Sequence, residues 1–352
     1  MHTTFRNLSR IYIIAFLLFI LGHYLIWKNV TEVFFTNKWD GGDLSRMGYI
    51  LDSKLNRKNH DTLPRRHIDL EGENTFRKVD VFTYGDSFSA GGGGGENRFY
   101  QDYIATINSL DVGNFHPFAA VNFLSALAAL NNDGYFDRIK PRHVVLSSSE
   151  KLCVERFSVP VNFGLHTPLE TLLPSKRDYY TSGQPDVKFI NTGNLNYLTF
   201  KLLYCFSPNA LFSNTYQVKL DRDYFSVRNS NVLLFYKNDV RSIKVTTDDN
   251  VRRLNDNMNM MADILARKGI RFYFMPCVDK YNLYSDFIVN NRFPRSVFFE
   301  KLRKLPKRYL LIDTKEMLLR ELQKGDKNVF YPDDTHWSWK ASETIFSRYR
   351  FR

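Results

Sequence analysis

The stretch Val79-Asp80-Val81-Phe82-Thr83-Tyr84-Gly85-Asp86-Ser87-Phe88-Ser89 decides the fold that we expect for this chain. Its first six residues form a short apolar run that is typical of a buried strand. Gly85 permits a tight turn directly after that strand. Ser87 on such a turn would hold its hydroxyl out at the carboxyl edge of a parallel sheet, where open α/β folds bind ligands.

Strand and helix patterns alternate on the carboxyl side of this turn. We expect further strands over residues 109–114, 143–147, 270–275 and 309–313, and helices over 98–108, 119–130, 251–268, 315–322 and 339–348. This alternation predicts an α/β fold of three layers, with a mostly parallel sheet covered by helices on both faces. Residues 157–245 break the pattern and are rich in Tyr, Phe and Asn. We interpret them as an insertion whose rings form a small core or stack on sugars.

The N-terminal region predicts a membrane anchor. Residues 11–27, IYIIAFLLFILGHYLIW, carry no charge and span about 25 Å as a helix, with aromatic residues near both ends. A signal peptide is the alternative, but no small-x-small cleavage site follows. The charge bias places residues 1–10 in the cytoplasm and the body outside it. Residues 28–77 are polar and predict a stalk with some helix over 43–58, followed by the main folded domain over 78–352.

Composition bounds the class of protein. With 43% hydrophobic and 24% charged residues among 352, the chain can bury a sizeable core. Its net charge of +12 comes from scattered residues, which argues against nucleic-acid binding and suits an anionic lipid surface, an acidic polymer or solubility alone. The three cysteines lie far apart without a C-x-x-C pair, which excludes a disulfide framework and a zinc finger.

A second motif, Tyr331-Pro332-Asp333-Asp334-Thr335-His336-Trp337-Ser338, carries a carboxylate close before a histidine. In an extended segment Asp334 shares a side with His336, whereas in a helical turn Asp333 does. Either carboxylate can fix the imidazole tautomer and leave the other ring nitrogen to take a proton from a serine. No second histidine stands at ligand spacing, so we predict neither a metal nor a cofactor.

Each motif alone has an ordinary structural explanation. Asp86 or Ser87 can cap a helix, and a lone Asp-x-His is often structural. Together they are more informative, because a serine after the first strand and an Asp/His pair before the last helix meet at one edge of such a sheet. We therefore predict a serine site built from Ser87 and His336.

The two motifs resemble the SGNH (GDSL-type) hydrolase superfamily, and most closely its alginate-type O-acetyltransferase branch, whose D-x-H-W motif reads Asp334-Thr335-His336-Trp337 here. Residues 274–284, 144–146 and 154–156 also look like that branch, so the resemblance spans roughly 75–350. It implies Ser87 as the nucleophile, with its N–H as an oxyanion donor, and His336 as general base and acid. Asp334 would orient the histidine, with Asp333 as the alternate.

The chain departs from the family pattern at three points. The glycine of the second block is not evident in Asn114-Phe115-His116-Pro117, and the G-x-N-D of the third is absent from Ser147-Ser148-Ser149-Glu150. Both blocks normally supply oxyanion donors. The serine also precedes the Asp/His pair, whereas the alginate enzymes can carry these motifs in the reverse order, which weakens the inference about substrate.

Other residues are candidates for supporting roles. We expect Arg156 to form a buried ion pair with Glu155 or to bind an anion. Lys280, Tyr281 and Tyr284 follow a strand and either line the cleft or pack in the core. The glycine run 91–95 is a lid hinge, an amide nest beside the nucleophile or a flexible loop.

The expected function is a single-pass membrane-anchored serine O-acetyltransferase of the periplasm or another extracytoplasmic space, acting on a polysaccharide through an acetyl-serine intermediate. The resemblance implies a multi-pass membrane-bound O-acyltransferase as the partner that supplies acetyl groups. A carbohydrate esterase with the same triad is the first alternative. A non-catalytic assembly or polysaccharide-binding subunit is the second, motivated by the two missing oxyanion blocks.

Overall fold

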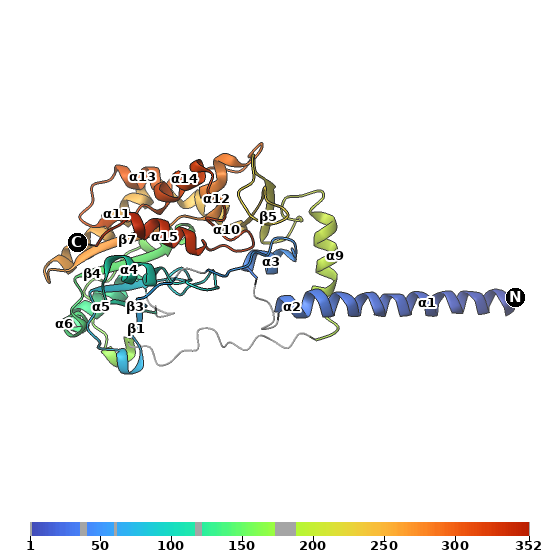
Figure 1. Ribbon diagram of the computed structural model, residues 1–352, viewed down its shortest axis with the longest axis horizontal. Coiled ribbons are helices and arrows are strands. Elements are labelled where there is room, and N and C mark those ends of the chain that lie inside the picture. Colours follow the sequence, from blue (N-terminus) through green and yellow to red (C-terminus); the bar gives the residue numbers. More distant parts are fainter. Residues whose placement is uncertain (1, 36–40, 60–61, 117–121, 173–187, 352) are drawn as a thin grey trace.

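The computed structural model describes residues 2–35, 41–59, 62–116, 122–172 and 188–351. Within these ranges a parallel six-stranded sheet forms the centre of the body, in the order β1-β3-β2-β4-β7-β8 (Figure 1). The α/β class and the parallel sheet expected from the sequence are confirmed. The strands are β1 (Ile68–Asp69), β2 (Val81–Gly85), β3 (Val112–Phe115), β4 (His143–Ser149), β7 (Arg271–Cys277) and β8 (Leu310–Leu311).

The strand order creates a crevice beside β2. The chain leaves β2 for β3 on one side and then returns past β2 to β4 on the other side. Gly85 pairs with Ser147, so β2 and β4 end at a similar level. Ligands of open parallel sheets bind where the direction of winding changes, at the carboxyl ends of the strands. The turn that carries Ser87 begins at this point.

Side chains alternate between the two faces of β2, and each face is covered by helices. Phe82 and Tyr84 face α5 (Phe123–Asn132) and α6 (Tyr135–Ile139). Thr83 points the other way, toward α4 (Tyr100–Asn108), through its hydrogen bond to Asn114. Further helices extend both layers: α15 (Trp339–Arg348) and α14 (Thr314–Lys324) on the α4 side, and α7 (Glu150–Phe157) and α11 (Asp248–Ala266) on the α5 side.

The observed elements lie close to the expected ones, with small shifts at their ends. The last helix, α15, has the predicted bounds, whereas β8 is shorter than the strand expected over 309–313. The helix expected over 119–130 begins at Phe123, capped by Asn122, and residues 119–121 lie outside the described ranges. Other helices of the body are α8 (Leu169–Leu172), α10 (Lys237–Arg241), α12 (Lys280–Tyr284) and α13 (Phe298–Lys304).

The insertion over 157–245 contains an antiparallel hairpin, β5 (Thr215–Lys219) and β6 (Val232–Tyr236), and helix α9 (Gly193–Leu203). The ring centroid of Phe235, on β6, lies 4.8 Å from that of Tyr281, and the ring centroid of Phe225 lies 5.6 Å from that of Tyr284. These aromatic residues are buried and join the main core. They therefore pack, rather than offering open ring faces to a sugar.

The N-terminal helix extends away from the body (Figure 1). Helix α1 (His2–Ile26) continues through a π-helical turn (Trp27–Thr31) into α2 (Glu32–Phe35). The stretch Phe5–Phe35 is long and apolar enough to cross a membrane, and none of its most apolar window is buried in the protein. The anchor expected over 11–27 lies within this helix.

The segment that we expected to be a stalk, 28–77, packs onto the domain where it is described. Helix α3 (Asp43–Gly48) begins beside the second motif: Gly42 N donates to Asp333 Oδ2 at 2.8 Å, and Ser45 N donates to the Asp333 carbonyl at 3.1 Å. Strand β1 completes one edge of the sheet. The sequence pattern suggested a stalk because this segment is mostly polar, and the partners of buried Arg57 and of Gly42 lie far away in the chain, at Asp333.

Candidate active site

The turn after β2 presents Ser87 to solvent. Ser89 N and Ala90 N both donate to the Asp86 carbonyl, and Gly92 N donates to the Ser87 carbonyl at 2.8 Å. These bonds close a compact turn and hold the backbone on both sides of the serine. Ser87 is exposed, whereas its neighbours Phe88 and Ser89 are buried. The hydroxyl therefore stands at the carboxyl edge of the sheet, as expected.

The second motif brings His336 to this hydroxyl. His336 Nε2 lies 2.7 Å from Ser87 Oγ, and His336 Nδ1 lies 2.7 Å from Asp334 Oδ1. Asp334 Oδ1 also accepts from the His336 backbone N–H at 2.9 Å. With Nδ1–H donating to the carboxylate, Nε2 is left to accept the serine proton, which is the arrangement of a serine–histidine–aspartate triad.

The charges of this pair favour an ionised carboxylate. Burial raises the pKa of Asp334, but the hydrogen bond and charge of His336 and the charge of Arg57 outweigh it and lower the pKa to about 2. Burial lowers the pKa of His336, but Asp334 outweighs it and raises the pKa above its ordinary value. Asp334 thus stays negative at neutral pH and stabilises an imidazolium.

Asp333, the alternate carboxylate, points to a different partner. It lies against Arg57, whose Nη2 donates to Asp333 Oδ1 at 2.9 Å and to Asp334 Oδ2 at 3.2 Å. Arg57 Nε also donates to the Gly93 carbonyl at 2.7 Å, and its guanidinium stacks 4.5 Å above the Tyr331 ring. This buried arginine joins the glycine run to the Asp/His loop. We missed its role because it falls in the predicted stalk.

Replacing Arg57 with methionine is expected to destabilise the protein by about 3 kcal/mol or more, because it leaves two buried carboxylates without their cation. The measurement is the urea-unfolding free energy of the full-length chain in detergent. Lys58→Met is the matched control, since Lys58 is the exposed neighbour. Equal unfolding free energies of the two variants would mean that residues 42–59 do not pack onto the domain and form a stalk instead.

Asp43 adds a second acid beside the histidine. Asp43 Oδ1 accepts from Thr335 N at 2.8 Å, and Oδ2 accepts from Thr335 Oγ1 at 2.6 Å. The ligand-type atoms of Asp43, Asp334 and His336 lie within 4.8 Å of one another. A cation held by all three would have to displace His336 from Asp334 and would sit close to Arg57. We therefore interpret this group as a hydrogen-bonded support for the histidine.

Gly92 of the glycine run lies against the imidazole. A Cβ atom at this position would stand 2.4 Å from His336 Nε2, a distance that no side chain can occupy without moving the ring. The glycine therefore allows the backbone to approach the proton-accepting nitrogen closely. The run is part of the wall of the site, and Arg57 ties its next residue, Gly93, to the Asp/His loop.

Lys280, Tyr281 and Tyr284 do not line a cleft. Lys280 is buried and its Nζ donates to the carbonyls of Tyr331, Pro332 and Asp334, so it supports the Asp/His loop from beneath. Burial lowers the pKa of Lys280 to about 7. Both tyrosines are buried among aromatic rings. The packing interpretation holds for them, and the cleft-lining one is wrong.

Arg156 pairs with Asp86 rather than with Glu155. Its Nη1 lies 2.6 Å from Asp86 Oδ2 and 2.8 Å from Ser148 Oγ, whereas Glu155 is exposed. Asp86 Oδ2 also accepts from Ser149 N at 2.8 Å. The aspartate of the Gly-Asp-Ser motif therefore ties the Ser87 turn to the end of β4 through Ser149 N, and to α7 through an ion pair that spans 70 residues.

The two sequence blocks that depart from the family pattern, at Asn114 and Ser149, do not offer a free oxyanion donor. Asn114 Oδ1 accepts hydrogen bonds from Thr83, Ser89 and Gln101, so this side chain holds the buried side of the turn that carries Ser87. Ser149 N is engaged by Asp86. Both groups are engaged elsewhere in this arrangement, and the Ser87 N–H stays the predicted oxyanion donor.

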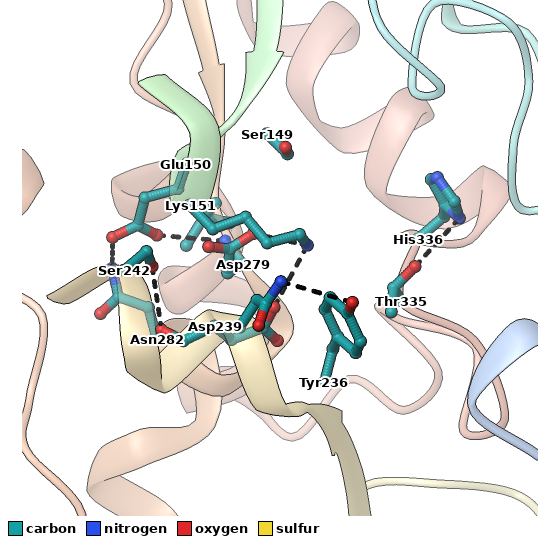
Figure 2. Close-up of polar contacts among 12 residues, drawn as sticks. Ser149, Glu150, Lys151, Tyr236, Asp239, Ser242, Asp279, Asn282, Thr335 and His336 are labelled. Atoms are coloured by element: carbon teal, nitrogen blue, oxygen red, sulfur yellow. Dashed lines mark hydrogen bonds and ion pairs between the residues drawn. The ribbon is translucent and has the colours of Figure 1, made fainter. Parts of the chain in front are cut away.

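A buried charged cluster borders the site on the side of α7 (Figure 2). Lys151 Nζ lies 3.1 Å from Asp239 Oδ1 and 3.3 Å from Asp279 Oδ1, and 5.6 Å above the Tyr236 ring. Glu150 accepts hydrogen bonds from Asn282, Ser296 and the Asp279 N–H. Figure 2 shows the Lys151 side chain pointing toward the side on which His336 lies. Sequence reasoning missed this cluster, although Glu150 directly follows β4 and Lys151 comes next.

No protein-family model matches this chain, and no curated protein matches it either. The geometry of Ser87, His336 and Asp334 and the resemblance of the motifs that carry them are therefore what bears on function.

Proposed function

We propose that this chain is a membrane-anchored serine O-acetyltransferase that acts through an acetyl-serine intermediate. The observation that carries the proposal is the continuous path from Ser87 Oγ to His336 Nε2 and from His336 Nδ1 to Asp334 Oδ1, both at 2.7 Å. Such a path requires that three residues from two distant motifs lie within hydrogen-bond distance of one another, and that the serine is exposed on a closed turn. A buried structural serine would have no use for it.

The reaction takes place in two matched halves. Ser87 Oγ attacks the acetyl carbonyl while His336 Nε2 takes the hydroxyl proton, and the imidazolium then gives that proton to the departing donor group. An acceptor hydroxyl next passes its proton to His336 and attacks the acetyl-serine. The acetyl group leaves Ser87, which regains its proton from the imidazolium. Asp334 remains a carboxylate throughout and holds the ring.

The substrates follow from the family resemblance and remain part of the proposal. The likeness to alginate-type O-acetyltransferases suggests a polysaccharide hydroxyl as the acceptor, in the periplasm or another extracytoplasmic space. It also suggests a multi-pass membrane-bound O-acyltransferase as the source of acetyl groups. The apolar helix Phe5–Phe35 supports a position next to such a partner, because it would hold the body at the membrane surface.

Two other functions can be weighed against the same triad. An esterase would have the same triad and would let water take the acetyl group, which the exposure of Ser87 permits. A non-catalytic subunit with a decayed site is disfavoured, because the Ser87–His336 contact of 2.7 Å is what a decayed site would lose.

The test uses the full-length chain in lipid nanodiscs, with an activated acetyl ester and neutral or acidic oligosaccharides. Mass spectrometry counts the acetyl groups on sugar, and Ser87→Ala is the control. Acetylated sugar that disappears in the variant supports transfer. Free acetate alone, also lost in the variant, would replace the transferase by the esterase. If wild type and variant behave alike, the nucleophile assignment fails.

The rate should depend on pH through His336, because only the neutral imidazole can accept the serine proton. Since the pKa of His336 is raised above 6.5, kcat/KM for an activated acetyl ester should rise with pH through a midpoint above that value. The pH profile of ester hydrolysis measures this midpoint. Below it the imidazolium is formed and activity is lost. A midpoint below 6.5 would contradict the proposed coupling to Asp334.

A further inference from the structure

Helix α9 carries apolar side chains on the face that points away from the body. Leu195, Leu198 and Leu202 are 55%, 53% and 62% exposed, and Phe206, just beyond the helix, is 78% exposed. Spacings of three and four residues place these four side chains along one line, which we call the leucine stripe. A water-facing helix would carry polar residues there, so the stripe requires another environment.

The opposite face of α9 is fixed to the body. Phe200 is buried, with its ring 5.5 Å from Tyr49 and 5.0 Å from Phe212. Tyr204 OH donates to the Thr215 carbonyl at 3.0 Å. Because the inner face is held by these contacts, the leucine stripe is not free to turn inward and its direction is set by the fold.

Helix α9 also contacts the exit of the apolar N-terminal helix. His23 Nε2 lies 2.9 Å from Asn194 Nδ2 and 2.9 Å from the Phe189 carbonyl, and Trp27 meets the Phe189 ring edge-on at 5.6 Å. Tryptophan and tyrosine rings favour the boundary between lipid and water. Figure 1 shows α9 oriented crosswise to α1, with one end of α9 beside the part of α1 from which the chain enters the body.

We propose that α9 lies in the headgroup and acyl boundary of the same bilayer that α1 crosses, with the leucine stripe immersed in it. A helix that crosses the membrane-spanning helix at its exit runs along the membrane surface. An apolar stripe on such a helix gains free energy by leaving water for the acyl region, as in interfacial amphipathic helices. This inference concerns membrane contact and does not depend on acetyl transfer.

The bilayer fits this surface better than a protein partner does, because α9 lies against the apolar N-terminal helix, where Asn194 contacts His23. Ile190, which follows Phe189 in the sequence, is also apolar and exposed. Any bilayer that holds α1 reaches the level of Trp27 and therefore the contact with α9. A partner protein would have to be recruited to this surface, whereas the lipid that surrounds α1 lies beside it in every molecule.

Docking of α9 would also fix the height of the active site above the membrane. Tyr49, which touches α9 through Phe200, directly follows α3, and α3 begins at Asp43 beside Thr335. A short chain of packed residues thus joins the interfacial helix to the loop of His336. The site is held at a set distance from the bilayer on two supports, α1 and α9, rather than on one flexible tether.

The test measures the environment of the stripe with a nitroxide spin label. Cys205 is the exposed cysteine of the chain, whereas Cys153 and Cys277 are buried, so Cys205→Ser provides a background with no exposed thiol. Leu198→Cys carries the label on the stripe, and Ala266→Cys carries it at the exposed end of α11. Full-length protein at one copy per nanodisc is exposed to oxygen, which concentrates in lipid, and to a water-soluble nickel chelate.

The expected result concerns the collision rate of the spin label with oxygen, divided by its collision rate with the nickel chelate. This ratio should be severalfold higher at Leu198→Cys than at Ala266→Cys. Adding Leu195→Glu and Leu202→Glu should lower that ratio toward the control. Equal ratios at the two labelled positions would overturn the proposal, because the stripe would then face water. A label shielded from both reagents would also overturn it in favour of a protein contact.

Discussion

Replacing Ser87 with alanine is expected to reduce the turnover of an activated acetyl ester by at least about 10⁴-fold, because it removes the atom that forms the covalent intermediate. His336 and Asp334 would keep their mutual contact, which does not involve the serine. Intact-protein mass spectrometry shortly after mixing should detect one added acetyl group on the wild type and none on the variant.

The control for this experiment is Ser347→Ala, an exposed serine on the last helix. It should keep both turnover and the acetyl-enzyme. Ser87 is itself exposed, so its replacement should leave the unfolding midpoint unchanged. An acetyl group that still appears on Ser87→Ala, localised by peptide mapping to another residue, would transfer the nucleophile role to that residue.

The second large effect is expected from Asp334→Asn, which should reduce turnover by about 10⁴-fold. An asparagine can turn its amide toward His336 Nδ1 and select the tautomer in which Nε2 carries the proton and cannot accept another. The variant should also lower the pKa of His336, because the charge that raises it is removed. The readouts are kcat and the midpoint of the pH profile.

Asp333→Asn is the matched comparison at the neighbouring position. It leaves the His336 contact in place and weakens the interaction with Arg57, so its main effect should be on stability rather than on turnover. A loss of turnover in Asp333→Asn that exceeds the loss in Asp334→Asn would make Asp333 the orienting carboxylate. The urea-unfolding free energy reports the effect on stability, and kcat reports the effect on turnover.

Much of the fold was predictable because its signals are local. The apolar runs of β2, β4 and β7 are each bounded by a turn or a proline, and α15 was expected with its observed bounds. The pairing of Ser87 with His336 was also expected, because the carboxyl ends of neighbouring parallel strands meet at one edge. These inferences needed only the alternation of strand and helix.

The supports of the site were not predictable in the same way. Arg57 and Asp43 stand in a polar segment that looks like a linker, and their partners lie near residue 334. Arg156 was assigned to its sequence neighbour Glu155, whereas the fold brings Asp86 to it. A charged residue finds whichever opposite charge the fold places beside it, and sequence distance says nothing about that placement.

The apolar N-terminal helix, the parallel α/β class and the two motifs that meet at the sheet edge could all be predicted from the sequence alone. These depend on hydrophobic runs, turn residues and the periodicity of strands and helices, which act over a few residues. Only the tertiary structure decided that Asp334 rather than Asp333 contacts His336 and that residues 42–59 belong to the domain. It also decided that α9 turns its leucines outward. The physical reason is that the environment of a side chain, buried pair or open surface, is set by elements far away in the chain.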